Sequence, residues 1–176
     1  MGCFFMCSCE NNMQEVQALG IKRASQEVAE NVESYMSQDG KVRAKLTAPL
    51  MLRTELDTPL VEFPKTLHVD FYGDSTKLES RLFAKYGRYL ERQGKVFLRD
   101  SVVVFNVKGD TLFTSELWWD RDKQIFYTEK YVIIKKPFGQ KLEGKNGMNA
   151  DQSFKNWELI NASGIQNIAD SAMPAN

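Results

Sequence analysis

Short runs in which apolar and polar residues alternate dominate the chain from Val28 onwards. The run HVDFY is one example, and turn-forming groups such as Gln38-Asp39-Gly40, Gln93-Gly94 and Lys108-Gly109-Asp110 separate such runs. These groups recur roughly every 8–15 residues, which is typical of an antiparallel meander or sandwich rather than of a βαβ fold. The pattern therefore predicts an all-β domain.

The same texture repeats at an interval of 30 residues. Segments that begin at Leu82, Leu112 and Leu142 align without gaps, and Gly109 and Gly139 fall in register in the connecting turns. A repeated strand–turn–strand unit predicts stacked hairpins, because each unit needs its neighbours to cover its apolar face.

Two adjacent tryptophans, Trp118 and Trp119, lie on an expected strand of the second copy. Successive strand residues face opposite sides, so one ring should fill the interior and the other should cover the outer face. Trp119 aligns with Tyr89 in the repeat, and we expect both to face the same way. A membrane-interface belt is the alternative role for such a pair.

The length of 176 residues fits one domain with flexible ends. We expect a tether over residues 1–27, a β domain over residues 28–168 and a disordered tail over residues 169–176. Lysine plus arginine equals aspartate plus glutamate at 23 each, which argues against a nucleic-acid partner. No run is long enough to span a bilayer as a helix, which takes about 20 apolar residues.

All three cysteines, Cys3, Cys7 and Cys9, lie in the first nine residues. The rest of the chain therefore has no disulfide framework and no cysteine-based zinc site. The opening MGCFFMCSCENN resembles the end of a bacterial lipoprotein signal, with Cys9 as the acylated residue. The apolar part is too short for a full signal peptide and has no basic region before it. The alternative is an N-terminus with incidental cysteines.

The sequence offers little for catalysis. His68 is the sole histidine and shares a strand face with Asp70, while Asp120 and Asp122 flank Arg121 in a charged turn. These groups form neither a nucleophile–base pair nor a metal set, which disfavours a small β-fold hydrolase. No GxxxxGK[ST] loop is present, so any ATP hydrolysis belongs to a partner. We expect no enzymatic activity, no metal and no cofactor.

Many weak matches in the right order carry a family resemblance. The strongest are EFPKTLHVDFY at Glu62–Tyr72, the segment GKVFLRDSVVVFNVKGDTLFTSELWWD, and QIFYTEKYVII. From Val28 to about Ile168 the chain resembles LptC, the lipopolysaccharide export system periplasmic protein, in its Bacteroidetes-like form. The resemblance implies an all-β fold: a twisted, partly open antiparallel β-jellyroll built from repeated hairpins, as in LptA.

The resemblance also implies a function in outer membrane biogenesis. An LptC protein is periplasmic and held at the inner membrane, where it accepts lipopolysaccharide from an ABC transporter of the LptB/LptF/LptG type. It passes the lipid through an apolar groove to an LptA-like bridge protein. The partner edges map to about residues 28–48 and 156–168. Family members are usually anchored by one transmembrane helix, so an acylated Cys9 would be a different anchor. The alternative is a non-carrier envelope scaffold that docks partners through its sheet edges.

Alternation along the strands predicts which side chains face inward, and an open jellyroll would let these side chains line a groove for lipid A acyl chains. A register error of one residue would exchange the two faces. The predicted groove-lining residues are Val69, Phe71, Leu82, Ala84, Tyr86, Val96, Leu98, Val102, Val104, Leu112, Thr114, Phe126, Thr128, Val132 and Ile134. The alternative is that these side chains form an ordinary core.

Overall fold

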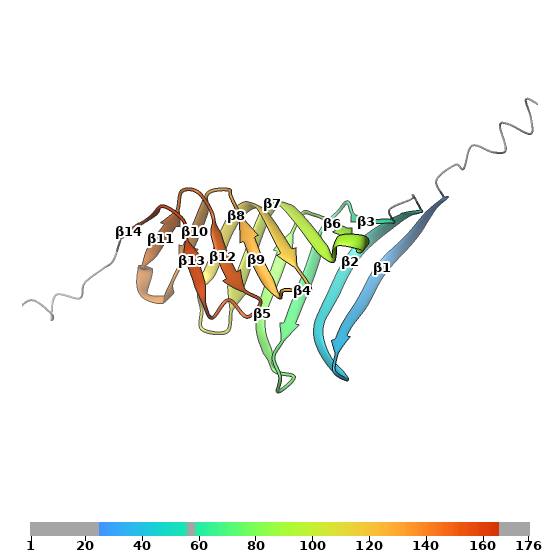
Figure 1. Cartoon of the computed structure of the whole chain (residues 1–176), viewed down its shortest axis with the longest axis horizontal. Coiled ribbons are helices and arrows are strands. Elements are labelled where there is room, and N and C mark those ends of the chain that lie inside the picture. The colour runs from blue at the N-terminus through green and yellow to red at the C-terminus, as the bar shows by residue number, and fades with distance from the viewer. Residues whose placement is uncertain (1–24, 56–58, 166–176) are drawn as a thin grey trace, which may run out of the picture.

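A computed structural model describes residues 25–55 and 59–165. The expected tail and all of the expected tether before Ser25 lie outside these residues, and so do Cys3, Cys7 and Cys9. The described chain consists almost entirely of antiparallel strands (Figure 1). The strands are β1 Ser25–Gln38, β2 Lys41–Glu55, β3 Leu60–Phe63, β4 Leu67–Tyr72, β5 Leu78–Ala84, β6 Tyr86–Leu90, β7 Lys95–Asn106, β8 Thr111–Asp120, β9 Ile125–Thr128, β10 Val132–Lys135, β11 Lys141–Gly144, β12 Met148–Asp151, β13 Trp157–Leu159 and β14 Ala162–Ile165. Two short 3-10 turns, η1 Glu91–Gln93 and η2 Pro137–Gly139, connect β6 to β7 and β10 to β11.

Three long strands, β2, β7 and β8, belong to both walls of the molecule. The first half of β2 pairs with β4 and its second half pairs with β3. The first half of β7 likewise pairs with β6 and its second half with β5, with a register shift between Arg99 and Val102. At the shift, Asp100 and Ser101 have φ values of 63° and 58°, so the strand bends there from one wall to the other.

The remaining strands extend these two walls. The first wall runs β2–β4–β5–β7–β8–β10–β11–β14, and the second runs β2–β3–β6–β7–β8–β9–β12–β13. Among the described residues, β1 pairs with β2 alone, and β13 and β14 have one partner each. The fold is therefore the expected twisted, partly open antiparallel β-jellyroll.

The β1–β2 hairpin forms one end of the molecule, and β14 lies at the other (Figure 1). The hairpin turns at Asp39 and Gly40, whose φ values of 53° and 73° suit a two-residue turn that matches the strand twist. This confirms the turn that the sequence predicted at Gln38-Asp39-Gly40. Strand β1 begins at Ser25, inside the segment expected to be a tether.

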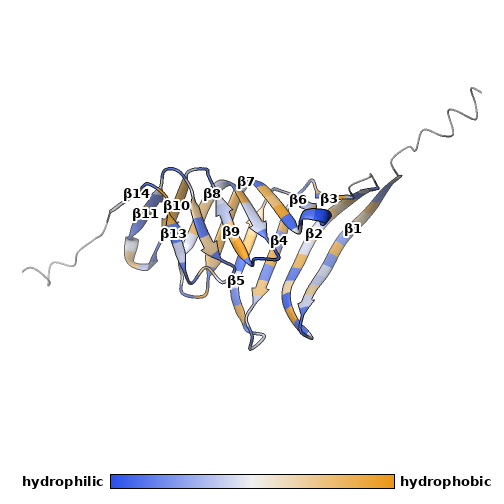
Figure 2. Ribbon diagram, viewed as in Figure 1, coloured by the Kyte–Doolittle hydropathy of each residue, from blue (hydrophilic) through white to orange (hydrophobic). Residues whose placement is uncertain are grey.

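Apolar and polar residues alternate along many of the strands (Figure 2). The apolar side chains on the inner faces form the buried interior between the walls. In β4, for example, Leu67, Val69 and Phe71 are buried, whereas His68 is exposed. The leucines that begin the three repeats lie in one cross-strand row, because Leu82 pairs with Val104, Val104 with Leu112, Leu112 with Ile134, and Ile134 with Leu142. Each repeat therefore begins on the first wall, at β5, β8 or β11, and its next strand, β6, β9 or β12, lies in the second wall.

Candidate functional site: an apolar cavity at the N-terminal end

A cavity of about 380 Å³ lies inside the N-terminal end of the jellyroll. This volume falls within the range of about 300–1,000 Å³ that is usual for ligand pockets. The β1–β2 hairpin covers one side, and strands β3 to β8, together with η1 and the β8–β9 turn, supply the rest. Its lining is mainly apolar and consists of Val32, Ser34, Tyr35, Met36, Ala44, Leu46, Met51, Arg53, Val61, Phe63, Leu67, Val69, Phe71, Leu82, Tyr89, Glu91, Val96, Leu98, Trp119 and Arg121.

Two interior rows of side chains meet at this cavity. The first wall contributes Leu46, Val69 and Leu82, which are partners in register. The second wall contributes a row in which Arg53 pairs with Val61, Val61 with Tyr89, Tyr89 with Val96, and Val96 with Trp119. The cavity therefore lies between the two walls, at the end where their interior side chains do not pack fully against each other.

Aromatic rings close the cavity on the C-terminal side. Phe71 and Trp119 contact each other edge to face, with ring centroids 5.2 Å apart. Behind them, Phe126 lies 5.5 Å from Phe71 and 4.7 Å from Phe154. Edge-to-face and offset arrangements of this kind are favourable and fill space closely. We call Phe71, Trp119, Phe126 and Phe154 the aromatic plug.

The expected directions of the twin tryptophans are confirmed. Trp119 is buried and lines the cavity together with Tyr89. Trp118 is half-buried on the outer face, where its ring contacts Phe97 at 4.8 Å and stacks on Tyr127 at 6.3 Å. One ring thus belongs to the interior and its neighbour covers the outside of the second wall.

Five of the predicted groove-lining residues line the cavity. They are Val69, Phe71, Leu82, Val96 and Leu98. Nine others are buried in the interior without lining it: Ala84, Val102, Val104, Leu112, Thr114, Phe126, Thr128, Val132 and Ile134. A hollow beside Val104, Leu112 and Ile134 measures only about 10 Å³, which is about the room that one water molecule needs. In this structure the C-terminal half is a packed core rather than an open groove.

The hydroxyl groups of the two threonines of the predicted set form hydrogen bonds with the backbone. Thr114 Oγ1 lies 3.1 Å from the carbonyl oxygens of both Glu116 and Tyr131, which share its single hydroxyl proton. Thr128 Oγ1 accepts a hydrogen bond from the backbone N–H of Lys130 at 3.0 Å. Both hydroxyls therefore hold the chain around the β9–β10 connection.

Tyr86 faces outward, contrary to the expected alternation. The strand is interrupted at Lys85, so Gly87 rather than Tyr86 packs inside against Leu67 and Leu98. On the outer face, Tyr86 donates a hydrogen bond to Glu62. Burial and the Glu62 carboxylate raise the pKa of the Tyr86 hydroxyl. The interruption shifts the facing by one residue, which no local feature of the sequence predicted.

Several cavity residues were absent from the sequence-based set. Those from β2 and β3 include Leu46, Met51, Val61 and Phe63, and β1 adds Val32 and Met36. The alternation in VRAKLTAPLML, which resembles a weaker first copy of the repeat, could have identified Leu46. Nothing local predicts that Met51 lines a hollow, because this depends on where β1 and β3 lie.

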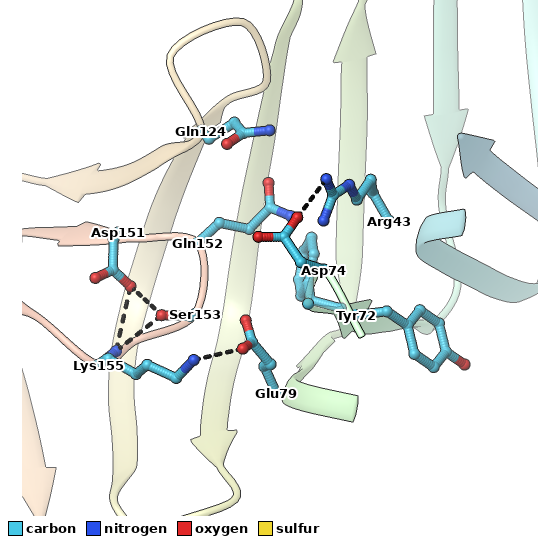
Figure 3. Close-up of a pocket in the computed structure, with 11 residues that line it drawn as sticks. Arg43, Tyr72, Asp74, Glu79, Gln124, Asp151, Gln152, Ser153 and Lys155 are labelled. Atoms are coloured by element: carbon cyan, nitrogen blue, oxygen red, sulfur yellow. Dashed lines mark hydrogen bonds and ion pairs between the residues drawn. The ribbon is translucent and has the colours of Figure 1, made fainter. Parts of the chain in front are cut away.

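A second pocket, of about 370 Å³, is polar and lies between the β4–β5 connection and the segment that follows β12 (Figure 3). Its cations are paired within the protein: Arg43 lies 2.7 Å from Asp74, and Lys155 pairs with Glu79. The Arg43 guanidinium lowers the pKa of Asp74, and the Glu79 carboxylate raises the pKa of Lys155. Ser80 also donates to the carbonyl of Gln152 at 3.1 Å. The contacts of Lys155 and Ser80 join the walls, and both cations of this pocket are paired with carboxylates, so the lining offers no excess of positive charge to an anionic ligand.

The contacts of the candidate acid–base residues His68 and Asp120 indicate structural roles. His68 is exposed and packs edge to face against Phe83 at 4.8 Å. Asp120 is buried and accepts the backbone N–H of Lys123 at 3.0 Å, which stabilises the β8–β9 turn. Across residues 25–55 and 59–165, no group of three His, Cys, Asp or Glu side chains could hold a metal ion. No helix of the described chain is long and apolar enough to cross a membrane.

The fold and the cavity together define a β-jellyroll protein with an internal apolar site at one end. The family described as "Lipopolysaccharide-assembly, LptC-related" matches residues 7–166. The chain belongs to the LptC family, which confirms the resemblance read from the sequence. No curated protein matches the chain.

As a member of this family, the protein is a component of the cell envelope that takes part in lipopolysaccharide transport. The family is one of transport proteins and is not known for enzymatic activity. It also implies interactions with the transport machinery.

Proposed function

We propose that this protein is a periplasmic lipopolysaccharide carrier held at the inner membrane. It accepts lipopolysaccharide from an ABC transporter complex of the LptB/LptF/LptG type and passes it to an LptA-like bridge protein. The apolar cavity at the N-terminal end is the observation that carries this proposal. Acylation of Cys9 would supply the anchor.

The chemistry of the cavity suits an acyl chain. Leu46, Met51 and Val96 are only half-buried, so the folded protein leaves apolar surface available to a ligand. Transfer of a methylene group from water to an apolar site is worth about 0.8 kcal/mol, so a chain of about a dozen carbons gains on the order of 10 kcal/mol. Association costs offset part of this gain.

The cavity in this conformation is smaller than the whole acyl part of lipid A. A cavity of about 150 Å³ holds one benzene molecule, so about 380 Å³ accommodates a single acyl segment. The side that can widen is the β1–β2 hairpin, because β1 pairs with β2 alone among the described residues. Entry of further chains would displace this hairpin or the aromatic plug.

The ends of the jellyroll offer edges for the partners. Within residues 25–55 and 59–165, β1 has one unpaired edge at the N-terminal end, and β13 and β14 have others at the C-terminal end. Unpaired backbone donors and acceptors on such edges accept a further strand. The transporter would dock near residues 28–48 and the bridge protein near residues 156–168.

Photocrosslinking in cells tests the carrier function. A photoreactive amino acid replaces Val96 or Met51 in the cavity, or Phe97, which is adjacent to Val96 and faces outward beside Trp118. We expect lipopolysaccharide adducts at Val96 and Met51 and none at Phe97.

The same experiment separates the carrier from the scaffold alternative. Absence of adducts at both cavity positions, in a folded protein that still copurifies with its partners, would overturn the carrier proposal and favour a scaffold. A position at Val132 reports on the packed half, where adducts would form only if the interior opens during transport.

A further inference from the structure

Three charged side chains line the same cavity as the apolar residues: Arg53, Glu91 and Arg121. They come from β2, from η1 and from the turn after β8, and they lie at the mouth of the cavity on the second wall. We call them the charged rim. Two guanidinium groups and one carboxylate give the charged rim a net positive charge.

The register directs Arg53 to the interior side of the second wall. Arg53 pairs with Val61, and Val61 pairs with Tyr89, so Arg53 begins the same row that continues to Val96 and Trp119. A charged residue in an apolar row is costly unless its group finds a partner. Arg53 Nε is shielded from solvent and has no hydrogen-bond partner among the described residues.

Glu91 only partly compensates Arg53. The distance from Arg53 Nε to Glu91 Oε1 is 3.8 Å, which allows an ion pair but is too long for a hydrogen bond. The Arg53 side chain as a whole is 40% exposed, so its guanidinium can still meet an oxygen atom at the mouth of the cavity. An anionic oxygen would form the short, charge-assisted hydrogen bond that the protein itself does not supply.

Local contacts hold Arg121 beside this position. Its guanidinium lies over the ring of Tyr89, 5.6 Å from the centroid, and Tyr89 lines the cavity. Its backbone N–H donates to the carbonyl of Gly94 at 3.0 Å, which joins the β8–β9 turn to the end of η1. Asp122 lies 3.8 Å from Arg121 Nε but does not line the cavity.

From this arrangement we infer that the charged rim binds the anionic headgroup, a phosphate or carboxylate, of the amphiphile whose acyl chain occupies the cavity. An acyl chain inside the cavity places its headgroup at the mouth, where Arg53 and Arg121 donate hydrogen bonds. Arginine suits this role because its planar fork matches phosphate and carboxylate oxygens. This inference rests on the proposed function and adds the recognition of charge.

Binding of purified full-length protein to matched lipids tests the charged rim. The probes are lipid A and its dephosphorylated form, together with phosphatidylglycerol and phosphatidylcholine that carry identical acyl chains. We expect wild type to bind each anionic lipid about tenfold more tightly than its neutral counterpart, and the preference to weaken with salt. Arg53→Gln/Arg121→Gln should abolish the preference, because the affinity for each anionic lipid falls to that for its neutral counterpart.

Two further variants test whether the charged rim itself causes the preference for anionic lipids. Lys123→Gln removes an exposed cation from the same turn, outside the cavity lining, and should leave the preference intact. Glu91→Gln removes the competing carboxylate and should increase the preference several-fold. A preference for lipid A without one for phosphatidylglycerol would assign the site to the lipid A phosphates, and equal preferences would assign it to anionic lipids in general.

The outcomes distinguish this inference from the proposed function. If wild type binds neutral and anionic lipids equally, or if the double variant keeps the wild-type preference, the charged rim is not the headgroup site, although the cavity still binds acyl chains. If neither lipid binds, the proposed function itself fails.

Discussion

The role of a single residue in this protein depends on whether its side chain faces the interior or the outer surface of its wall. Trp118 and Trp119 are adjacent, yet one stacks outside on Tyr127 and the other lines the cavity. Arg53 has its position because of register, since it lies in an interior row that is otherwise apolar. Gly147 has φ 106°, and a Cβ atom there would lie 1.9 Å from the carbonyl oxygen of Thr128, so only glycine fits.

Asp151 organises the loop that closes the walls beneath the plug. Its carboxylate accepts hydrogen bonds from Ser153 Oγ at 2.6 Å, from Asn156 Nδ2 at 2.7 Å and from backbone N–H groups. Burial acts to raise the pKa of Asp151, but the bonds from Ser153 and Asn156 outweigh it and lower the pKa below its usual value. A lowered pKa stabilises the fold above the unfolded pKa of about 3.9, and this stability is lost as pH falls through the folded pKa.

We therefore predict a pH-dependent effect of Asp151→Asn. At pH 7 the variant should lose about 1 kcal/mol of unfolding free energy, which is less than the roughly 1.5–3 kcal/mol usual for hydrogen bonds to a charged group, because the site is half-exposed. The loss should begin to shrink below about pH 4, where the carboxyl of the unfolded chain becomes protonated, and should shrink further as pH falls through the lower folded pKa. Urea unfolding at pH 7 and at pH 3 measures the two losses of unfolding free energy, with Asp122→Asn as an exposed control. An equal loss at pH 7 and pH 3 would contradict the assignment.

At the scale of elements, the β1–β2 hairpin is the part whose movement would open the cavity. It supplies Val32, Met36 and Leu46 to the lining. Its tip is joined to the β8–β9 turn by a hydrogen bond of 2.8 Å from Gln124 Nε2 to Gln38 Oε1. This contact links the hairpin to the β8–β9 turn of the second wall beside the polar pocket, which Gln124 lines.

A covalent lock tests whether the hairpin moves during lipid uptake. Gln38→Cys and Gln124→Cys, with Cys3, Cys7 and Cys9 replaced by serine, would be joined by a short cleavable bis-maleimide. We expect the lock to slow lipid association at least tenfold, and cleavage of the linker to restore the rate. A lock within the hairpin, between Gln38→Cys and Lys41→Cys, should leave the rate unchanged. Equal rates for the locked and open protein would show that lipid enters elsewhere.

Much of the element structure was predictable because it is local. The Asp39-Gly40 turn and the alternation in HVDFY predicted the hairpin and the facing of β4. The interruption at Lys85, which turns Tyr86 outward, and the bend at Asp100 and Ser101 depend on how two walls share one strand. Which buried residues line a hollow depends on tertiary packing, so Val96 and Val132 looked alike in the sequence although only Val96 lines the cavity.

At the scale of the whole molecule, the two ends of the jellyroll differ. The N-terminal end contains an apolar cavity with a charged rim, whereas the C-terminal half is packed behind the aromatic plug. Transfer between similar apolar sites is nearly neutral in free energy, so direction must come from a partner. We propose that lipid enters beside the β1–β2 hairpin and that passage onward requires the plug to rearrange.

The most direct test of this account is quenching of tryptophan fluorescence by lipid A with brominated acyl chains. Bromine quenches a neighbouring indole, and Trp119 lines the cavity whereas Trp118 lies on the outer face. We predict that wild type and Trp118→Phe are quenched alike, and that Trp119→Phe loses most of the quenching while it still binds unbrominated lipid A. Quenching that survives in Trp119→Phe but disappears in Trp118→Phe would place the acyl chains outside the jellyroll and contradict the account.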